Sequence, residues 1–460
     1  MKFLGVDFEV KNIPELDKGF IPLGSFFDGY LKGAKKPVTL AIKRPDGTTS
    51  IYDTFIHDTA DMREADRFYI SRLVKILLWI RGGASVIVCG DEQIAGHIKA
   101  EYCAGGCRSF DAEFMGRVFD TYFTVNYSPI DEKPGANEKT FSVGNNFDGC
   151  RIGFDAGGSD RKVSAVVDGE AIYSEEVVWH PKLNEDPEYH FNGIVESFKT
   201  AASKMPKVDA IGVSSAGIYL DNHVVVASLF IRVPLPVFNE KVKDIFIRAT
   251  KEIGDVPLYV LNDGDTTALS GAENLDQGSV LGIAMGTSQA GGYVTGEGTI
   301  TNWLNELAFV PLDCNPDAMR DEWSGDIGCG VKYFSQDGVN KLAEAAGIKL
   351  DAGLSPAEKL KITQELMEAG DGKAEEVFRG IGIYLANAIN LYDRFYDLKN
   401  ILLLGRVMSG EGGNVISKTA ERVLKEEYPE LAKRVVLVLP DKSSRRVGQS
   451  ITAAGLPKIE

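Results

Sequence analysis

The sequence has few cysteines and no long hydrophobic run, and both absences narrow the class of protein. Six cysteines in 460 residues are too few for a disulfide framework, so we expect free thiols in a reducing compartment. The apolar runs are short, as at 76–80 and 401–404, whereas a membrane helix needs roughly 20 apolar residues. Asp7 and Glu9 interrupt the start of the chain, where a secretory signal needs an apolar stretch. The expected location is therefore the cytoplasm.

The chain also has fewer basic than acidic residues. Its 50 Lys and Arg against 66 Asp and Glu give a formal net charge of −16, so the average surface repels phosphate backbones and anionic headgroups. Neither nucleic acid nor a membrane is an expected partner. The composition, 44% hydrophobic with 49 Gly and 18 Pro, is that of an ordinary globular protein. The length predicts about three folding units.

Several familiar motifs are missing. The chain contains neither Gly-x-x-x-x-Gly-Lys-Ser/Thr nor Gly-x-Gly-x-x-Gly, which argues against a P-loop nucleotidase and a dinucleotide-binding fold. Ser215 lacks the leading glycine of a nucleophile elbow. Cys103 and Cys107 form the one closely spaced pair, and no second pair completes four ligands, so we expect no zinc site there.

The pattern of apolar runs and turn formers divides the chain into four parts. The last two parts, 151–270 and 271–460, each begin with a strand, a glycine turn and a second strand, followed by helices. We interpret them as structural repeats, although no fixed period in the sequence supports this. The four parts are an α/β unit of unknown role at 1–126, a linker at 127–150, and the two repeats at 151–270 and 271–460.

The first glycine turn lies between the β-rich runs 151–154 and 163–167. Adjacent glycines let backbone N–H groups approach an oxyanion without interference from a Cβ atom. An aspartate here would repel phosphate, so its expected role is to hold Mg²⁺. Taken alone, the turn equally suits a simple β-hairpin. Its candidate residues are Asp155, Gly157, Gly158, Ser159 and Lys162.

Two further glycine corners follow apolar strands. Gly286, Thr287 and Ser288 again combine glycine with hydroxyl groups. Two such loops suggest two clamps on one polyphosphate. Gly405 follows the strand 401–404, where a simple strand-to-helix corner is the alternative interpretation.

Asn262 and Asp263 follow the apolar strand 258–261. In an open α/β sheet, the carboxyl ends of such strands face the ligand site. A carboxylate there can accept the proton of an attacking hydroxyl, and the neighbouring amide can orient that hydroxyl. The alternative is an ordinary turn in which the acidic residue caps a helix.

In combination, these motifs resemble the actin-like ATPase superfamily of sugar kinases, and most closely its ROK and bacterial hexokinase branch. The resemblance covers residues 151–460. It implies an α/β fold with two actin-like, ribonuclease H-like lobes around a central cleft, to which the N-terminal α/β unit is an addition. Five motifs occur in the family's order, namely Asp155-x-Gly157-Gly158-Ser159, Ser215-Ala216-Gly217, Asn262-Asp263-x-Asp265-x-x-Ala268, Gly286-Thr287-Ser288 and Leu404-Gly405.

The resemblance also implies a role for each matched residue. Asp263 corresponds to the catalytic base, and Asn262 and Glu306 to sugar-binding residues. Both glycine loops correspond to phosphate-binding loops for ATP, with Mg²⁺ at Asp155, a basic residue at Lys162 and the adenosine loop at Gly405. The implied activity is ATP-dependent phosphorylation of a hydroxyl on a small sugar or polyol, and a homodimer is compatible with it.

Some positions depart from the family's pattern. Phe309 stands where the family has a histidine that contacts sugar and ligates zinc, and only Cys329 remains of its cysteine cluster. We therefore expect no structural zinc. Arg406 and Val407 replace glycines of the adenosine loop, which predicts crowding at the nucleotide base. The departures favour one alternative, a non-catalytic ROK-like binding or regulatory protein; a filament-forming or chaperone-like ATPase is another.

Overall fold

The computed structural model describes residues 1–439 and 448–459. The chain divides into two compact units. Among the described residues, no helix is both long enough and apolar enough to cross a membrane. The first unit comprises Met1–Lys139, Ile283–Gly291 and Asn302–Val438, and the second comprises Thr140–Gly282, Gly292–Thr301 and the described part of Leu439–Glu460.

A five-stranded sheet forms the centre of the second unit, in the order β10-β9-β8-β11-β14. β8 pairs with β9 in antiparallel fashion, whereas β8, β11 and β14 are parallel to one another. The carboxyl ends of these three strands therefore meet at one edge of the sheet. The strands are β8 (Cys150–Ala156), β9 (Asp160–Val167), β10 (Glu170–Val178), β11 (Ala210–Ser215) and β14 (Leu258–Asn262).

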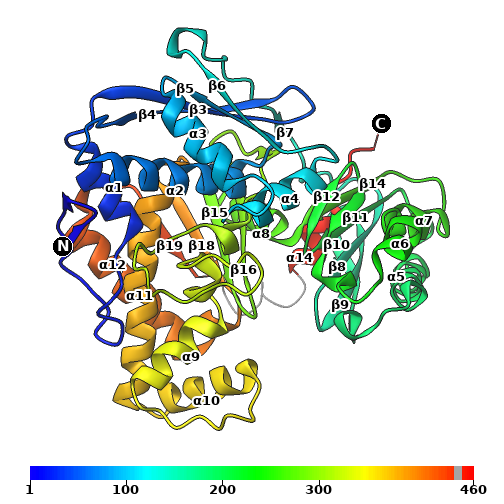
Figure 1. The fold of residues 1–460 in the computed structure, drawn as a ribbon. Coiled ribbons are helices and arrows are strands. Elements are labelled where there is room, and N and C mark those ends of the chain that lie inside the picture. The colour runs from blue at the N-terminus through cyan, green and yellow to red at the C-terminus, as the bar shows by residue number, and fades with distance from the viewer. Residues whose placement is uncertain (440–447, 460) are drawn as a thin grey trace. The chain divides into compact units, whose positions relative to one another are not determined.

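Helices cover both faces of this sheet (Figure 1). On one face, α5 (Pro187–Ala202) and α7 (Ile245–Lys251) bury an apolar core in which Phe154 packs edge-on against Phe198. On the other face lies α14 (Gly448–Ala454). Gly153 and Gly212 face α14 so closely that a Cβ atom at either position would collide with a carbonyl oxygen of the helix. Glycine is therefore required at both positions.

A second sheet repeats this order. It runs β19-β18-β15-β16-β17-β7. When β15 to β19 are numbered one to five along the chain, they lie in the order three, two, one, four, five, counted from β17 to β19. The five strands of the other sheet, numbered in the same way from β8 to β14, lie in the same order from β10 to β14. The two sheets therefore share one strand order, without any repeat in the residues themselves. The bounds 151–270 and 271–460 of the two repeats stay a prediction. The strands are β7 (Thr140–Phe141), β15 (Val280–Met285), β16 (Gln289–Val294), β17 (Ile300–Thr301), β18 (Asn400–Leu404) and β19 (Val436–Val438).

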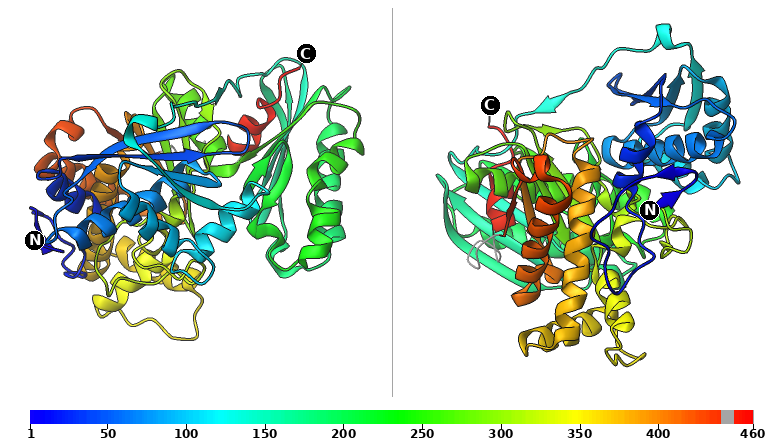
Figure 2. Two further views of the ribbon diagram at one scale, coloured as in Figure 1. Left: turned by 45° about the horizontal axis from the view of Figure 1, so that its top comes forward. Right: turned by 90° about the vertical axis from the view of Figure 1, so that its left-hand side faces the viewer.

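The N-terminal part is a mixed α/β structure, as predicted. Its sheet has the order β4-β3-β5-β6, formed by β3 (Lys36–Lys43), β4 (Thr49–Ile56), β5 (Ser85–Cys89) and β6 (Thr124–Ser128). Its helices are α1 (Leu23–Leu31), α2 (Arg63–Arg81), α3 (Glu92–Glu101) and α4 (Ser109–Val118). Figure 2 shows the N-terminal segment beside α11 (Gly372–Tyr392) and α12 (Gly410–Glu427) of the same unit, and α1 packs against α11.

The first glycine turn is shorter than the sequence predicts. β8 continues through Ala156 and β9 begins at Asp160, so only residues 157–159 form the turn. Asp155 lies opposite Lys162 in the strand pair. Opposite charges on facing strand positions stabilise the pairing, which explains why the strands extend past the apolar runs.

Glu273, in α8 (Asp263–Leu275), makes the stability of the fold depend on pH. Burial raises its pKa from 4.5 to about 7, although the backbone N–H of Asn145 and the hydroxyl of Thr452 at 3.5 Å lower it. Because the folded-state pKa is the higher one, the folded state loses stability as the pH rises through this window.

We expect Glu273→Gln to stabilise the protein at pH 8 by about 1–3 kcal/mol and to have little effect near pH 4.5. Thermal melts at the two pH values measure the difference. Glu170→Gln, at an exposed position of β10, is the matched control and should change neither melt. A lower melting temperature for Glu273→Gln at pH 8 would contradict this account.

Candidate active site

Predicted site residues of the second unit gather at the carboxyl ends of its parallel strands. Asp155 is near the end of β8 and Asp263 directly follows β14. Between them, on β11, Ser214 is in register with both Asp155 and Leu261. Side chains in register on neighbouring strands share a face of the sheet, so Ser214 and Asp155 point the same way.

Asp155 is a buried carboxylate that fits a cation. It is 4% exposed, and burial raises its pKa to about 6. The ammonium of Lys162, 3.6 Å from its Oδ2, lowers that pKa, whereas the carboxylate of Asp263 raises it. The hydroxyl of Ser214 is fully buried and has no hydrogen-bond partner among the described residues. Hard oxygen donors of this kind are the ligands that Mg²⁺ prefers.

Asp263 is the first residue of α8 and is only partly exposed. Its pKa is raised by burial, against the N–H of Gly264 and the charge of Lys182, which lower it. The Asn262 side chain is used within the protein: its Oδ1 accepts the Gly264 N–H at 2.7 Å, and its Nδ2 donates to the Gly217 carbonyl at 2.6 Å. These two bonds fix the corner that carries Asp263. The predicted sugar contact of Asn262 stays a prediction.

The first glycine turn is hydrogen-bonded to Trp179. The indole N–H of Trp179 donates to the Gly157 carbonyl at 2.8 Å, and its backbone N–H donates to the Ser159 carbonyl at 3.1 Å. Gly158 and Ser159 at the tip are exposed. The ammonium of Lys162 contacts Asp160 at 2.9 Å as well as Asp155, so its charge is balanced by two carboxylates.

The other predicted phosphate and adenosine residues belong to the first unit. In the turn between β15 and β16, Thr287 and Ser288 are exposed, and the Gly286 carbonyl accepts the Gln336 N–H at 2.8 Å. Gly405 has φ +92°, and a Cβ atom there would collide with the Met285 carbonyl, just before this turn. The first unit therefore brings Gly405 and residues 286–288 together.

The predicted crowding by Val407 is wrong. Its side chain is fully buried in the core, because residues 406–408 form a short 3₁₀ turn that directs it inward. Arg406 is exposed. The Val407 side chain therefore does not lie on the surface at Gly405, where the sequence alone places it.

The loop with Glu306 is bound to the N-terminal helix α2. The N–H groups of Asn305 and Glu306 donate to the carbonyls of Ile80 and Trp79, at 3.0 and 2.9 Å, in the last turn of that helix. The ring of Phe309 stacks on Trp79, with centroids 4.2 Å apart. Phe309, which the resemblance aligns with a histidine, therefore makes an aromatic contact with the N-terminal part of this chain.

Two residues near Asp263 were missed by the sequence analysis. Tyr219 donates to the Ser215 hydroxyl at 2.7 Å, and its pKa is raised by burial and by the charge of Asp263. Lys182 lies over Gly158, with its Nζ 3.3 Å from where a Cβ atom of that residue would be. Neither belongs to a motif, because each reaches the site through packing of the chain.

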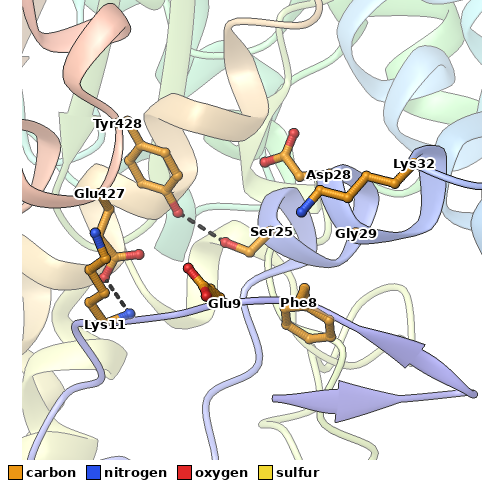
Figure 3. Close-up of a pocket in the computed structure, with 9 residues that line it drawn as sticks. All are labelled: Phe8, Glu9, Lys11, Ser25, Asp28, Gly29, Lys32, Glu427 and Tyr428. Carbon is orange, nitrogen blue, oxygen red and sulfur yellow. Dashed lines mark hydrogen bonds between the residues drawn. The ribbon is translucent and has the colours of Figure 1, made fainter.

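A pocket of about 180 Å³ in the first unit contains none of these residues (Figure 3). The hydroxyls of Ser25 and Tyr428 are 2.9 Å apart, and the Glu427 carboxylate accepts the Lys11 N–H at 3.0 Å. Charges of both signs line it, so it indicates no class of ligand. Its lining residues are Phe8, Glu9, Lys11, Ser25, Asp28, Gly29, Lys32, Glu427 and Tyr428.

Comparison with known proteins decides the fold. No protein-family model matches the chain, and no curated protein matches its sequence. A ROK family glucokinase from Streptomyces griseus, solved with glucose and AMPPNP, matches with a TM-score of 0.51 and 20% identity over 66% of this chain and 98% of that one. The fold is the actin-like fold of ROK proteins.

The ROK fold does not by itself define an activity. A ROK family transcriptional regulator, a homolog of the E. coli MLC protein, matches with a TM-score of 0.50 and 17% identity, over 67% of this chain and 78% of that one. At such identities the likeness establishes the fold alone. The predicted fold class is confirmed, and the choice of activity depends on the residues of the site.

Proposed function

We propose that this protein is a kinase that transfers the terminal phosphoryl group of ATP to a hydroxyl of a sugar or polyol. The arrangement of Asp155 and Asp263 beside the glycine turn at 157–159 carries the proposal. The three meet where parallel strands end, the place at which open α/β sheets bind ligands. Glucose and AMPPNP in the Streptomyces griseus glucokinase support the two ligand classes.

In the proposed reaction, Asp263 accepts the proton of the acceptor hydroxyl and later releases it to water. A bond forms between that hydroxyl oxygen and the γ-phosphorus of ATP. The bond from this phosphorus to the β,γ-bridging oxygen breaks, and its electron pair stays on ADP. The raised pKa of Asp263 increases its affinity for the proton, which suits a general base.

Asp155 would hold Mg²⁺, directly or through water, with the Ser214 hydroxyl on the same face. When bound, Mg²⁺ neutralises charge on the phosphates during transfer. The turns at 157–159 and 286–288, together with Gly405, are the proposed contacts to the nucleotide. Lys162 balances the charge of Asp155 when the cation is absent.

Glu306 is the proposed acceptor-binding carboxylate, positioned by its backbone bond to Trp79. Phe309 cannot donate or accept the hydrogen bonds of an imidazole. The acceptor therefore binds without a partner at that position, and its pattern of hydroxyls need not be that of glucose.

ADP release measured with Mg²⁺, ATP and a panel of hexoses, N-acetylhexosamines, pentitols and inositols tests the proposal. At least one compound should raise ADP release well above the rate without acceptor. If none does, and ADP release is absent, the kinase assignment is contradicted.

A sugar-responsive regulator is the second candidate, favoured by Phe309 and by the ROK regulator of similar fold. It predicts calorimetric binding of a sugar without phosphorylated product. Any phosphorylated sugar in the reaction mixture would exclude it.

A further inference from the structure

Two lysines lie at the first glycine turn, and they differ in whether another residue neutralises them. Lys162 contacts Asp160 at 2.9 Å and Asp155 at 3.6 Å. Lys182 forms no hydrogen bond or ion pair with any residue in the described part of the chain, yet its charge reaches Asp263 and lowers the pKa of that carboxyl. Of the two ammonium groups, Lys182 is therefore the one available to an anionic ligand.

The position of Lys182 is fixed through its backbone. It lies in the 3₁₀ turn Pro181–Leu183, which follows Trp179. Trp179 is 2% exposed and binds the carbonyls of Gly157 and Ser159, and the fully buried ring of His190 contacts the Pro181 carbonyl at 3.0 Å through Nε2. These contacts hold the turn against the glycine hairpin.

The lysine chain then passes over Gly158. A Cβ atom at Gly158 would be 3.1 Å from Cε and 3.3 Å from Nζ of Lys182, so the Lys182 side chain would have to shift by a few tenths of an ångström to make room for it. Glycine at position 158 therefore lets the Lys182 ammonium lie close against the hairpin.

We propose that Lys182 contacts the terminal phosphoryl group of ATP and favours ATP over ADP. This inference rests on the proposed kinase function and adds a residue to it. Transfer spreads negative charge over the oxygens of that phosphoryl group, and a positioned ammonium stabilises that charge. Lysine serves as a compact point charge for phosphate, as it does in other phosphate-binding loops.

The test compares Lys182→Met and Lys182→Arg with the natural protein. Calorimetry with Mg-ATP and Mg-ADP gives the two affinities, and steady-state kinetics with the best acceptor gives kcat and KM. Lys182→Met should weaken ATP binding about 10- to 100-fold, the range for a hydrogen bond to a charged group, and ADP binding much less. It should also lower kcat, and Lys182→Arg should recover most of both losses.

Lys199→Met is the matched control, because Lys199 is an exposed lysine on α5 of the same unit, 57% exposed as a side chain. It should leave both affinities unchanged. The inference would be overturned, and the kinase function left intact, if Lys182→Met bound ATP as tightly as the natural protein does, bound ADP as tightly as the natural protein does, and had an unchanged kcat. Failure of the natural protein to bind either nucleotide would overturn both.

Discussion

Asp263→Asn is expected to lower kcat by about 10²- to 10⁴-fold, because the reaction loses its general base. Asparagine preserves the shape of the side chain and can still accept the Gly264 N–H bond, which the Asp263 carboxylate accepts at 3.0 Å. ATP affinity and the melting temperature should therefore change little. Steady-state kinetics with a saturating acceptor measure the loss.

Asp276→Asn provides the matched control for this substitution. Asp276 is exposed, lies just after the same helix, and has a left-handed backbone with φ +51° that asparagine tolerates. The kcat of the Asp276→Asn variant should equal that of the natural protein. A kcat for Asp263→Asn within threefold of the natural value would remove Asp263 from the mechanism.

The pH dependence of the natural enzyme follows from the same group. Because burial raises the pKa of Asp263, protonation inactivates the base at a higher pH than for an exposed aspartate. kcat should fall as the pH decreases through that pKa. The residual activity of Asp263→Asn should lack this acidic limb.

Asp326→Ala is expected to destabilise the first unit by about 3–5 kcal/mol, the usual cost of leaving buried charges without their partner. Three cationic groups surround the Asp326 carboxylate: Arg72 at 2.8 Å, Lys75 at 3.1 Å and Arg108 at 2.5 Å. All four side chains are less than a tenth exposed. Urea denaturation followed by tryptophan fluorescence measures the loss, since Trp79 is in the same unit.

Asp28→Ala is the control for this prediction. The ion pair of Asp28 with Arg394 also joins the N-terminal part to the later chain, but the Asp28 side chain is 48% exposed. Exposed pairs of this kind contribute about 0–1 kcal/mol. If Asp326→Ala shifts the urea midpoint no more than Asp28→Ala does, the buried cluster is not stabilising.

The surroundings of Asp326 also determine in which direction its contribution to the stability of the fold changes with pH. Burial would raise its pKa, but Arg72, Lys75 and Arg108 hold it well below the usual range. A lowered folded-state pKa stabilises the fold above the unfolded pKa of about 3.9 and loses that contribution as the pH falls. The difference between Asp326→Ala and the natural protein should therefore shrink below pH 4.

The Asp326 cluster and the Trp79–Phe309 stack give the N-terminal residues a physical role. Both join α2 to the later chain of the first unit, close to Cys329 and to the loop of Glu306. Aromatic packing and buried ion pairs therefore hold these loops of the first unit to α2.

The sequence alone predicted the repeated sheets, because each repeat begins with an apolar strand and a glycine turn. It also placed Asp155 and Asp263 at strand ends, which the parallel sheet brings together. It could not predict Lys182 or Tyr219, since both reach the site through tertiary packing. The sequence also could not predict that the Val407 side chain points into the core, because a short 3₁₀ turn, and not the residue type, directs that side chain.

The phosphorus-31 NMR spectrum of the reaction mixture tests the central claim most directly. With Mg²⁺, ATP and an accepted polyol, we predict a new phosphomonoester resonance that grows with ADP, and no growth in the Asp263→Asn sample. Inorganic phosphate formed at the same rate with and without polyol would instead identify an ATPase. A spectrum unchanged by any polyol, with sugar binding still detected by calorimetry, would contradict the kinase assignment.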